Sequence, residues 1–183
     1  LKQTSPLGVQ LDSLADDVTF GLAPAMVMYD LYIHSTSYYG LDPEVMGWLK
    51  WGVLIIAAFS VLRLAKFNID TTQTDSFVGL PTPACALFVG SLAWHVAEKG
   101  AAINPWIILA LAVVFAILLL VPLRMFSLKF HGFAPKGINL LRYSFLALSA
   151  LLIVLCGLSA VAWIIILYIA TSIVMSLTCK GKN

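Results

Sequence analysis

Two aspartates near the start of the chain could bind a metal ion together. Asp12 and Asp16 lie four residues apart, and Gly8 precedes them by the same interval, in the pattern G-x-x-x-D-x-x-x-D. In a helix these positions share one face, and two carboxylates there repel each other unless a cation or proton lies between them. Hard oxygen ligands suit Mg²⁺ or Mn²⁺. A solvated helix start explains the spacing about equally well, and Asp17, off this face, is interpreted as a helix-dipole or interface residue.

Two further patterns carry polar or rigid residues. Arg63 and Lys66 are three residues apart, so on a helix they can face one anion together, and Asn68 adds a polar group. Taken alone, such a basic pair at a helix end is more often only a topology signal. Residues 79–83 read G-L-P-T-P and open an apolar run. They indicate either a simple helix start or a rigid segment beside a substrate pocket.

The composition indicates that lipid is the solvent. Of the 183 residues, 61% are hydrophobic and 11% charged, and the mean hydropathy is +0.95. Soluble domains are about 45–50% apolar and about 25% charged. The apolar runs are continuous rather than alternating, which predicts helices and not barrel strands. The net charge of +2 suggests no nucleic-acid partner, and the three cysteines have no spacing that indicates a disulfide framework or a zinc site.

The sequence predicts an all-α, polytopic transmembrane helix bundle with six spans in one domain, residues 1–183. A span needs roughly 20 mostly apolar residues. The candidate segments are Leu11–His34, Val45–Ala65, Leu80–Ala97, Pro105–Leu123, Leu140–Cys156 and Ala160–Leu177. Gly157 and Ser159 predict a tight turn between the last two segments.

The distribution of basic residues predicts the orientation of these spans. With the N-terminus in the cytosol, nine Lys and Arg residues fall on the inner side, and only Lys50 and Lys99 fall on the outer side. The inner residues are Lys2, Arg63, Lys66, Arg124, Lys129, Lys136, Arg142, Lys180 and Lys182. An integral membrane protein with the Asp12/Asp16 pair facing the cytosol is therefore expected.

Taken together, these patterns resemble the CDP-alcohol phosphotransferase family. The stripe of Gly8, Asp12 and Asp16 is similar to the second half of its signature, D-x-x-D-G-x-x-A-R followed by G-x-x-x-D-x-x-x-D. Residues 63–68, R-L-A-K-F-N, and 79–84, G-L-P-T-P-A, resemble the phosphatidylserine synthase branch, with Lys66 in place of the usual Arg. The first half of the signature is absent from this chain. The resemblance therefore implies two further N-terminal helices and eight spans in the complete protein.

The resemblance also implies an activity: transfer of the phosphatidyl group from CDP-diacylglycerol to L-serine, giving phosphatidylserine and CMP in a prokaryotic cytoplasmic membrane. It implies that Asp12 and Asp16 bind Mg²⁺ or Mn²⁺, that Asp16 is also the catalytic base, and that the enzyme is a homodimer. The residues implied in substrate binding are Gly8, Arg63, Lys66 and Asn68.

Other functions remain compatible with part of the pattern. The acceptor could be glycerol 3-phosphate or inositol, or the serine reaction could use an archaeal ether lipid. A membrane transporter would carry charges near the bilayer midplane, whereas here they cluster at the inner helix ends, apart from Asp30. A purely structural membrane subunit would leave three ordered motifs unexplained. The sequence therefore favours a membrane-bound phosphotransferase.

Overall fold

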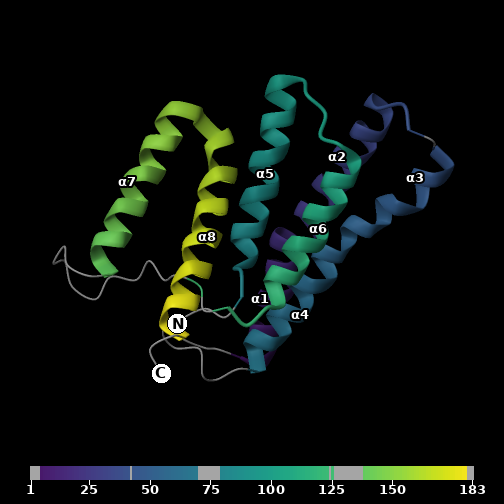
Figure 1. The fold of residues 1–183 in the computed structure, drawn as a ribbon. Coiled ribbons are helices and arrows are strands. Elements are labelled where there is room, and N and C mark those ends of the chain that lie inside the picture. Colours follow the sequence, from purple (N-terminus) through teal and green to yellow (C-terminus); the bar gives the residue numbers. More distant parts are fainter. Residues whose placement is uncertain (1–4, 42, 70–78, 124, 126–137, 181–183) are drawn as a thin grey trace.

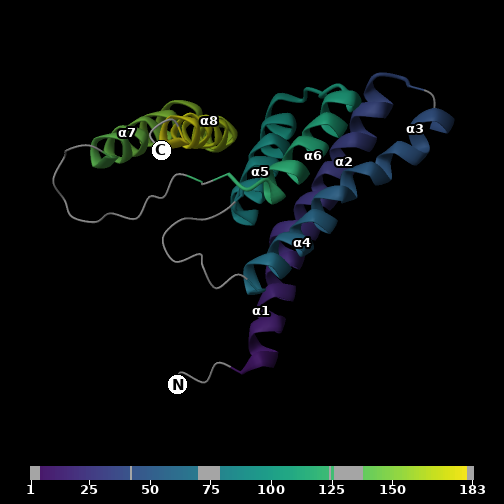
Figure 2. The same cartoon turned by 60° about the horizontal axis from the view of Figure 1, so that its bottom comes forward.

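The computed structural model describes residues 5–41, 43–69, 79–123, 125 and 138–180. In these ranges the regular structure is helical, without strands, which confirms the all-α prediction. The elements are α1 (Pro6–Asp17), η1 (Val18–Leu22), α2 (Ala23–Tyr38), α3 (Pro43–Leu49), η2 (Lys50–Leu54), α4 (Ile55–Ile69), α5 (Thr82–Lys99), α6 (Pro105–Leu120), α7 (Ile138–Cys156), η3 (Gly157–Ser159) and α8 (Ala160–Lys180). Figure 1 shows them side by side, and in Figure 2 α1 extends beyond the rest of the bundle.

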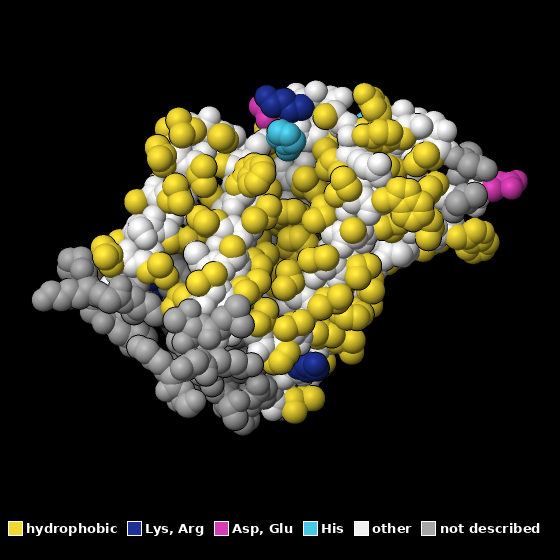
Figure 3. Space-filling view, viewed as in Figure 1, with side chains coloured by type: hydrophobic (Ala, Val, Ile, Leu, Met, Phe, Trp, Pro, Cys, Tyr) yellow, Lys and Arg dark blue, Asp and Glu magenta, His cyan; other side chains and the backbone are white. Residues whose placement is uncertain are grey.

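Each of the six predicted segments falls on a helix, but only part of the membrane prediction is confirmed. In the described part of the chain, two helices are long and apolar enough to cross a membrane, Met46–Ile69 and Asn139–Ser176, and α6 is a shorter apolar helix. Only 22% and 11% of the most apolar stretches of the two long helices are buried, so both present apolar side chains outward. Hydrophobic side chains also cover much of the face in Figure 3. A helical membrane protein accounts for this surface, and six spans stay a prediction.

The helical run from α1 to α2 contains a single π-helical turn, η1. Pro24 in the first turn of α2 has no N–H, and a proline ring crowds the carbonyl four residues earlier. A wider turn just before the proline accommodates this defect. Gly21 lies buried in η1, and a Cβ placed there would be 2.6 Å from the Ser60 Oγ of α4. The absence of a side chain at Gly21 therefore allows η1 to lie directly against α4.

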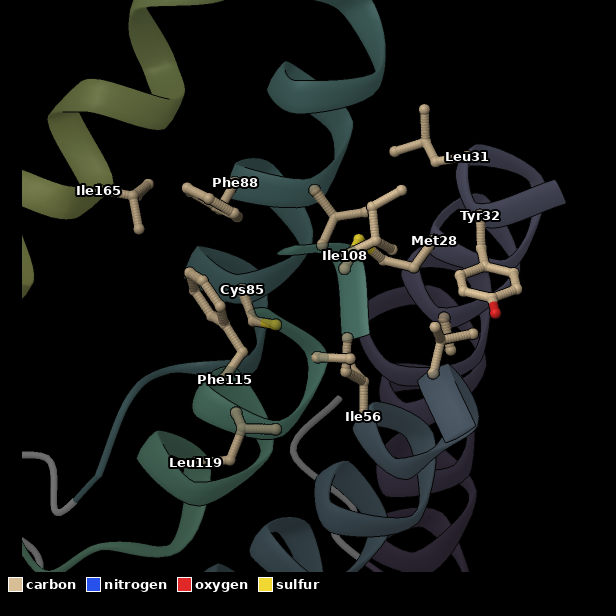
Figure 4. Close-up of a cluster of buried hydrophobic side chains, with 14 of the residues drawn as sticks. Met28, Leu31, Tyr32, Ile56, Cys85, Phe88, Ile108, Phe115, Leu119 and Ile165 are labelled. Atoms are coloured by element: carbon tan, nitrogen blue, oxygen red, sulfur yellow. The ribbon is translucent and has the colours of Figure 1, made fainter. Parts of the chain in front are cut away.

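The hydrophobic core lies between α2, α4, α5 and α6 and extends to α8 (Figure 4). Its nearly or fully buried members include Met28, Tyr32, Ile56, Cys85, Phe88, Ile108, Phe115 and Leu119. The rings of Phe88 and Phe115 stack with their centroids 4.4 Å apart. Ile165 of α8 lies beside Phe88 in Figure 4, so α5 connects the α7–α8 hairpin to the rest of the bundle.

The α7–α8 hairpin closes through the tight turn that the sequence predicts. Gly157 has a φ of +60°, which favours glycine, and it begins the short helix η3. Ser91 of α5 binds both sides of this turn. Its hydroxyl donates to the Leu158 carbonyl at 2.8 Å and accepts from the Ala162 N–H at 2.9 Å. These two bonds attach the hairpin to α5.

The residues that open α5 are held against the end of α6. The Gly79 N–H donates to the Leu123 carbonyl at 2.9 Å, and the Leu80 N–H donates to the Leu118 carbonyl at 2.9 Å. Gly79 has a φ of +79°, and a Cβ at this position would be 2.6 Å from the Leu119 carbonyl oxygen. The glycine of the G-L-P-T-P motif is therefore required by backbone packing, which makes this segment a rigid entry to α5.

Replacing Gly79 by alanine is expected to destabilise the protein by about 2–4 kcal/mol, because the new Cβ meets a carbonyl in a strained conformation. Gly90→Ala is the matched control, since Gly90 lies inside α5 and a Cβ there has no neighbour within 4 Å. The control variant should have the stability of the wild type or be more stable by up to about 1 kcal/mol. Thermal unfolding of both variants in detergent measures the difference, and equal stability of the two variants would contradict this role of Gly79.

Candidate functional site

The predicted stripe of Gly8, Asp12 and Asp16 lies on one helix, α1. Ser5 caps this helix: its Oγ accepts a hydrogen bond from the Gly8 N–H at 3.0 Å. Pro6 occupies the first helical turn, where a missing N–H is tolerated. Because all three stripe positions have helical geometry, the two carboxylates project from the same side of α1, one turn apart.

The two carboxylates of the stripe are accessible to a ligand. Asp12 is exposed and Asp16 is half-buried. Among the residues that the structure describes, no cluster of three or more His, Cys, Asp or Glu side chains could hold a metal ion. Two carboxylates on one face fit a hard divalent cation by their chemistry. They supply only part of a complete ligand set.

Helix α4 runs antiparallel to the α1–η1 run and contacts it at two levels. Near the end of α4, the Asn68 Nδ2 donates to the Ser13 Oγ at 2.8 Å, and the Ser13 hydroxyl donates to the Val9 carbonyl at 3.1 Å. Eight residues earlier on α4, Ser60 lies against Gly21. The predicted substrate residue Asn68 is thus placed beside the aspartate stripe, where its amide connects α4 to α1.

Arg63 and Lys66 are in different environments, although both lie near the same end of α4. Arg63 is half-buried, and its Nε is buried without a hydrogen-bond partner in the described part of the protein. Lys66 is exposed in the last turn of α4. Arg63 therefore has a buried Nε–H that no described residue accepts, whereas Lys66 faces the surroundings.

Sequence reasoning did not identify Asp17 and Ser60 as a pair. The Asp17 Oδ1 and the Ser60 Oγ are both buried and have no hydrogen-bond partner among the described residues. Both contact the position where a Gly21 Cβ would be. The available sequence signal was a second stripe with four-residue spacing, Ser13, Asp17 and Gly21, next to the aspartate stripe. Ser13 and Gly21 both contact α4, which indicates that this second stripe faces α4.

The remaining acid of the first predicted segment, Asp30, lies far from this site. It follows Asp16 by 14 residues in one helical run, which is roughly 20 Å along the axis. Asp30 and His34 are exposed and line an open hollow of about 650 Å³ beside Val96 and Gly100. This acid is therefore a suitable control position for experiments on the aspartate stripe.

Comparison with known proteins gives a match that includes the whole site. The sequence profile of the family described as CDP-alcohol phosphatidyltransferase matches residues 1–118. This range contains the aspartate stripe, Arg63, Lys66 and Asn68, as well as Asp17 and Ser60.

Individual relatives are similar over shorter segments. A CDP-diacylglycerol–serine O-phosphatidyltransferase of Helicobacter pylori (strain J99) is 40% identical over 88 residues, which are 47% of this chain and 33% of the relative. The protein of the same name from Bacillus subtilis is 35% identical over 83 residues, 45% of this chain and 42% of the relative. An archaetidylserine synthase of Methanothermobacter thermautotrophicus is 31% identical over 84 residues, 46% of this chain and 32% of the relative. The chain thus matches less than half the length of each of these relatives.

Proposed function

This chain belongs to the CDP-alcohol phosphatidyltransferase family, and from this membership we propose that it transfers the phosphatidyl group of CDP-diacylglycerol to L-serine, forming phosphatidylserine and CMP. The observation that carries the proposal is the family match over residues 1–118, which includes a helix with two accessible carboxylates on one face. The names of the bacterial relatives support serine as the acceptor.

In this proposal Asp12 and Asp16 hold Mg²⁺ or Mn²⁺. The bound cation would neutralise the pyrophosphate of the CDP-lipid and stabilise the departing CMP. Asp12 is the more exposed of the two and serves as a ligand only. Further oxygen ligands come from the substrate or from other parts of the protein.

Asp16 is the proposed general base. A serine hydroxyl is a poor nucleophile at neutral pH, and a positioned carboxylate can remove its proton during attack. The hydroxyl oxygen forms a bond to the phosphorus that carries diacylglycerol, the bond from that phosphorus to the CMP oxygen breaks, and the proton moves to Asp16. The half-buried position of Asp16 shields this proton transfer better than the exposed position of Asp12.

The remaining predicted residues bind or position the substrates. Gly8 has no side chain and allows the CDP group to approach α1. The Arg63 Nε, which has no hydrogen-bond partner in the described ranges, can donate to a phosphate or to the serine carboxylate. Lys66, exposed at the helix end, attracts the anionic headgroup. Asn68 supports the site by holding α4 against α1.

We place the site at the cytosolic face of a prokaryotic cytoplasmic membrane, in a homodimer. Arg63 and Lys66 lie toward the α4 end that meets α1, whereas Lys50 and Lys99 lie at the opposite ends of α4 and α5. This distribution supports the proposed orientation. Lys2, Arg124, Lys129, Lys136 and Lys182 lie outside the described residues. The acyl chains of the CDP-lipid remain in the bilayer.

The test is CMP release by the full-length protein in lipid vesicles with Mn²⁺. CDP-diacylglycerol is supplied with L-serine, glycerol 3-phosphate or inositol in parallel, and CDP-archaeol replaces it in a second series. Serine with CDP-diacylglycerol is expected to give the highest rate. A higher rate with another acceptor would show that the acceptor is wrong, and no CMP release with any acceptor would reject the transferase function.

A further inference from the structure

A small polar niche, formed by Asp17, Gly21 and Ser60, lies where α1 meets η1 against α4. Ser60 is completely buried, with an exposed fraction of 0%. The Ser60 Oγ and the Asp17 Oδ1 are buried without a hydrogen-bond partner in the described part of the protein. Buried polar atoms are nearly always paired in folded proteins. Two such atoms against the same glycine are therefore open to a hydrogen-bonding ligand.

The Ser60 Oγ and the Asp17 Oδ1 both lie against Gly21. A Cβ at Gly21 would be 2.6 Å from the Ser60 Oγ and would also clash with the Asp17 Oδ1. A carboxylate only accepts hydrogen bonds, and a hydroxyl can accept as well, so the complementary ligand is a donor. A mutual bond between Ser60 and Asp17 would satisfy the hydroxyl, and the Asp17 carboxylate could still accept from a positively charged donor, because its Oδ1 has no hydrogen-bond partner among the described residues. The niche therefore fits a cationic group with several N–H donors.

A half-buried positive group, Arg63, follows the niche on α4. The Arg63 Nε is also buried without a hydrogen-bond partner in the described ranges, and Arg63 follows Ser60 by three residues. Three residues correspond to a rise of about 4.5 Å along a helix. Arg63 thus lies about one helical turn further along α4 than Ser60. The Asp17 carboxylate and the Arg63 guanidinium together carry charges complementary to the ammonium and carboxylate of an α-amino acid.

We propose that Asp17 and Ser60 bind the ammonium group of the amino-acid acceptor, while Arg63 receives its carboxylate. This inference rests on the proposed function and adds the residues that select the acceptor. Asp17 is the chain neighbour of Asp16, so the two side chains leave the helix at nearly the same level, about 100° apart. Binding the ammonium at Asp17 therefore keeps the serine hydroxyl within reach of Asp16, the proposed base.

The niche also disfavours the alternative acceptors. Glycerol 3-phosphate and inositol have no ammonium group, so either molecule would leave the Asp17 carboxylate unpaired. A phosphate next to Asp17 would in addition be repelled by the like charge. A site with polar groups placed for one substrate rejects analogues that lack the matching group. Asp17 is thereby a specificity residue.

The experiment compares L-serine with 3-hydroxypropionate, which has the hydroxyl and the carboxylate but no ammonium group. In the full-length protein, Asp17→Asn is expected to raise the KM for serine by about tenfold or more and to leave the KM for CDP-diacylglycerol within about twofold. The preference for serine over 3-hydroxypropionate should fall by a similar factor. Ser60→Ala should raise the KM for serine by about threefold. Ser35→Ala is the matched control, because Ser35 is 1% exposed, has no hydrogen-bond partner among the described residues, and lies on α2 outside the niche.

Stabilisation of the protein by each compound is measured in parallel, as a shift of the unfolding temperature. L-serine should stabilise the wild type more than 3-hydroxypropionate does, and Asp17→Asn should remove that difference. An unchanged preference in Asp17→Asn would overturn the proposal. An equal rise in the KM for both compounds, together with a lower unfolding temperature of the variant, would also overturn the proposal. Asp17 would then have only a structural role. Serine-specific stabilisation without any CMP release would support the niche and reject the transferase function, so the two failures can be distinguished.

Discussion

Asp16→Asn is expected to reduce CMP release from CDP-diacylglycerol and serine by at least about a thousandfold. A general base alone contributes about 10²–10⁴-fold, and the variant also loses a negative metal ligand. Asparagine has nearly the same volume as aspartate, and Asp16 is only half-buried on α1. The change in folding stability should therefore stay within about 0.5 kcal/mol. The measurement is CMP release by the full-length variant in vesicles at saturating serine and Mn²⁺.

The control for Asp16 is the same substitution at Asp30. Asp30 is an exposed acid on the same helical run, outside the aspartate stripe, so Asp30→Asn should retain wild-type turnover. Circular dichroism and thermal unfolding of both variants establish that each one folds. If folded Asp16→Asn turned over at the wild-type rate, Asp16 would be excluded as the base.

Asp12→Asn is expected to raise the Mn²⁺ concentration needed for half-maximal activity by at least about tenfold. Asp12 is exposed, one helical turn before Asp16, and the amide of the variant carries no charge to hold the cation. Excess Mn²⁺ should restore much of the turnover, because the base Asp16 is retained. Removal of divalent metal by a chelator should abolish the activity of both the wild type and the variant.

A direct measurement of metal binding accompanies this titration. The paramagnetic resonance signal of free Mn²⁺ reports how much of the ion is bound, without any turnover. Weaker binding by Asp12→Asn and wild-type binding by Asp30→Asn are expected. An identical Mn²⁺ titration for wild type and Asp12→Asn would show that Asp12 is not a ligand.

The sequence by itself determined the helices and the order in which they follow one another. In lipid, only helices and closed barrels satisfy all backbone hydrogen bonds, and continuous apolar runs do not have the alternation of barrel strands. Glycine or proline marks where the runs begin and end. Pro105 begins α6 and Gly157 begins the turn before α8, as the pattern predicts. The stripe of Gly8, Asp12 and Asp16 was also predictable, because residues four apart share a helix face whatever surrounds them.

The tertiary structure decided which of these helix faces meet. Asn68 and Ser13 are 55 residues apart in the chain, and their hydrogen bond forms because α4 packs antiparallel to α1. Such packing also places the half-buried Arg63 and the exposed Lys66 in different environments, although their three-residue spacing suggested a shared anion. The requirement for glycine at position 79 comes from a carbonyl of α6.

Asp17 shows most clearly the difference between what the sequence determined and what the tertiary structure decided. Its sequence position, next to the aspartate stripe, indicated only a helix-dipole or interface residue. The π-helical turn and the approach of α4 bury its Oδ1 beside Ser60, a residue 43 positions away. Local spacing determines the side of a helix from which a residue projects. What that side contacts depends on the packing of distant helices, which no local pattern encodes.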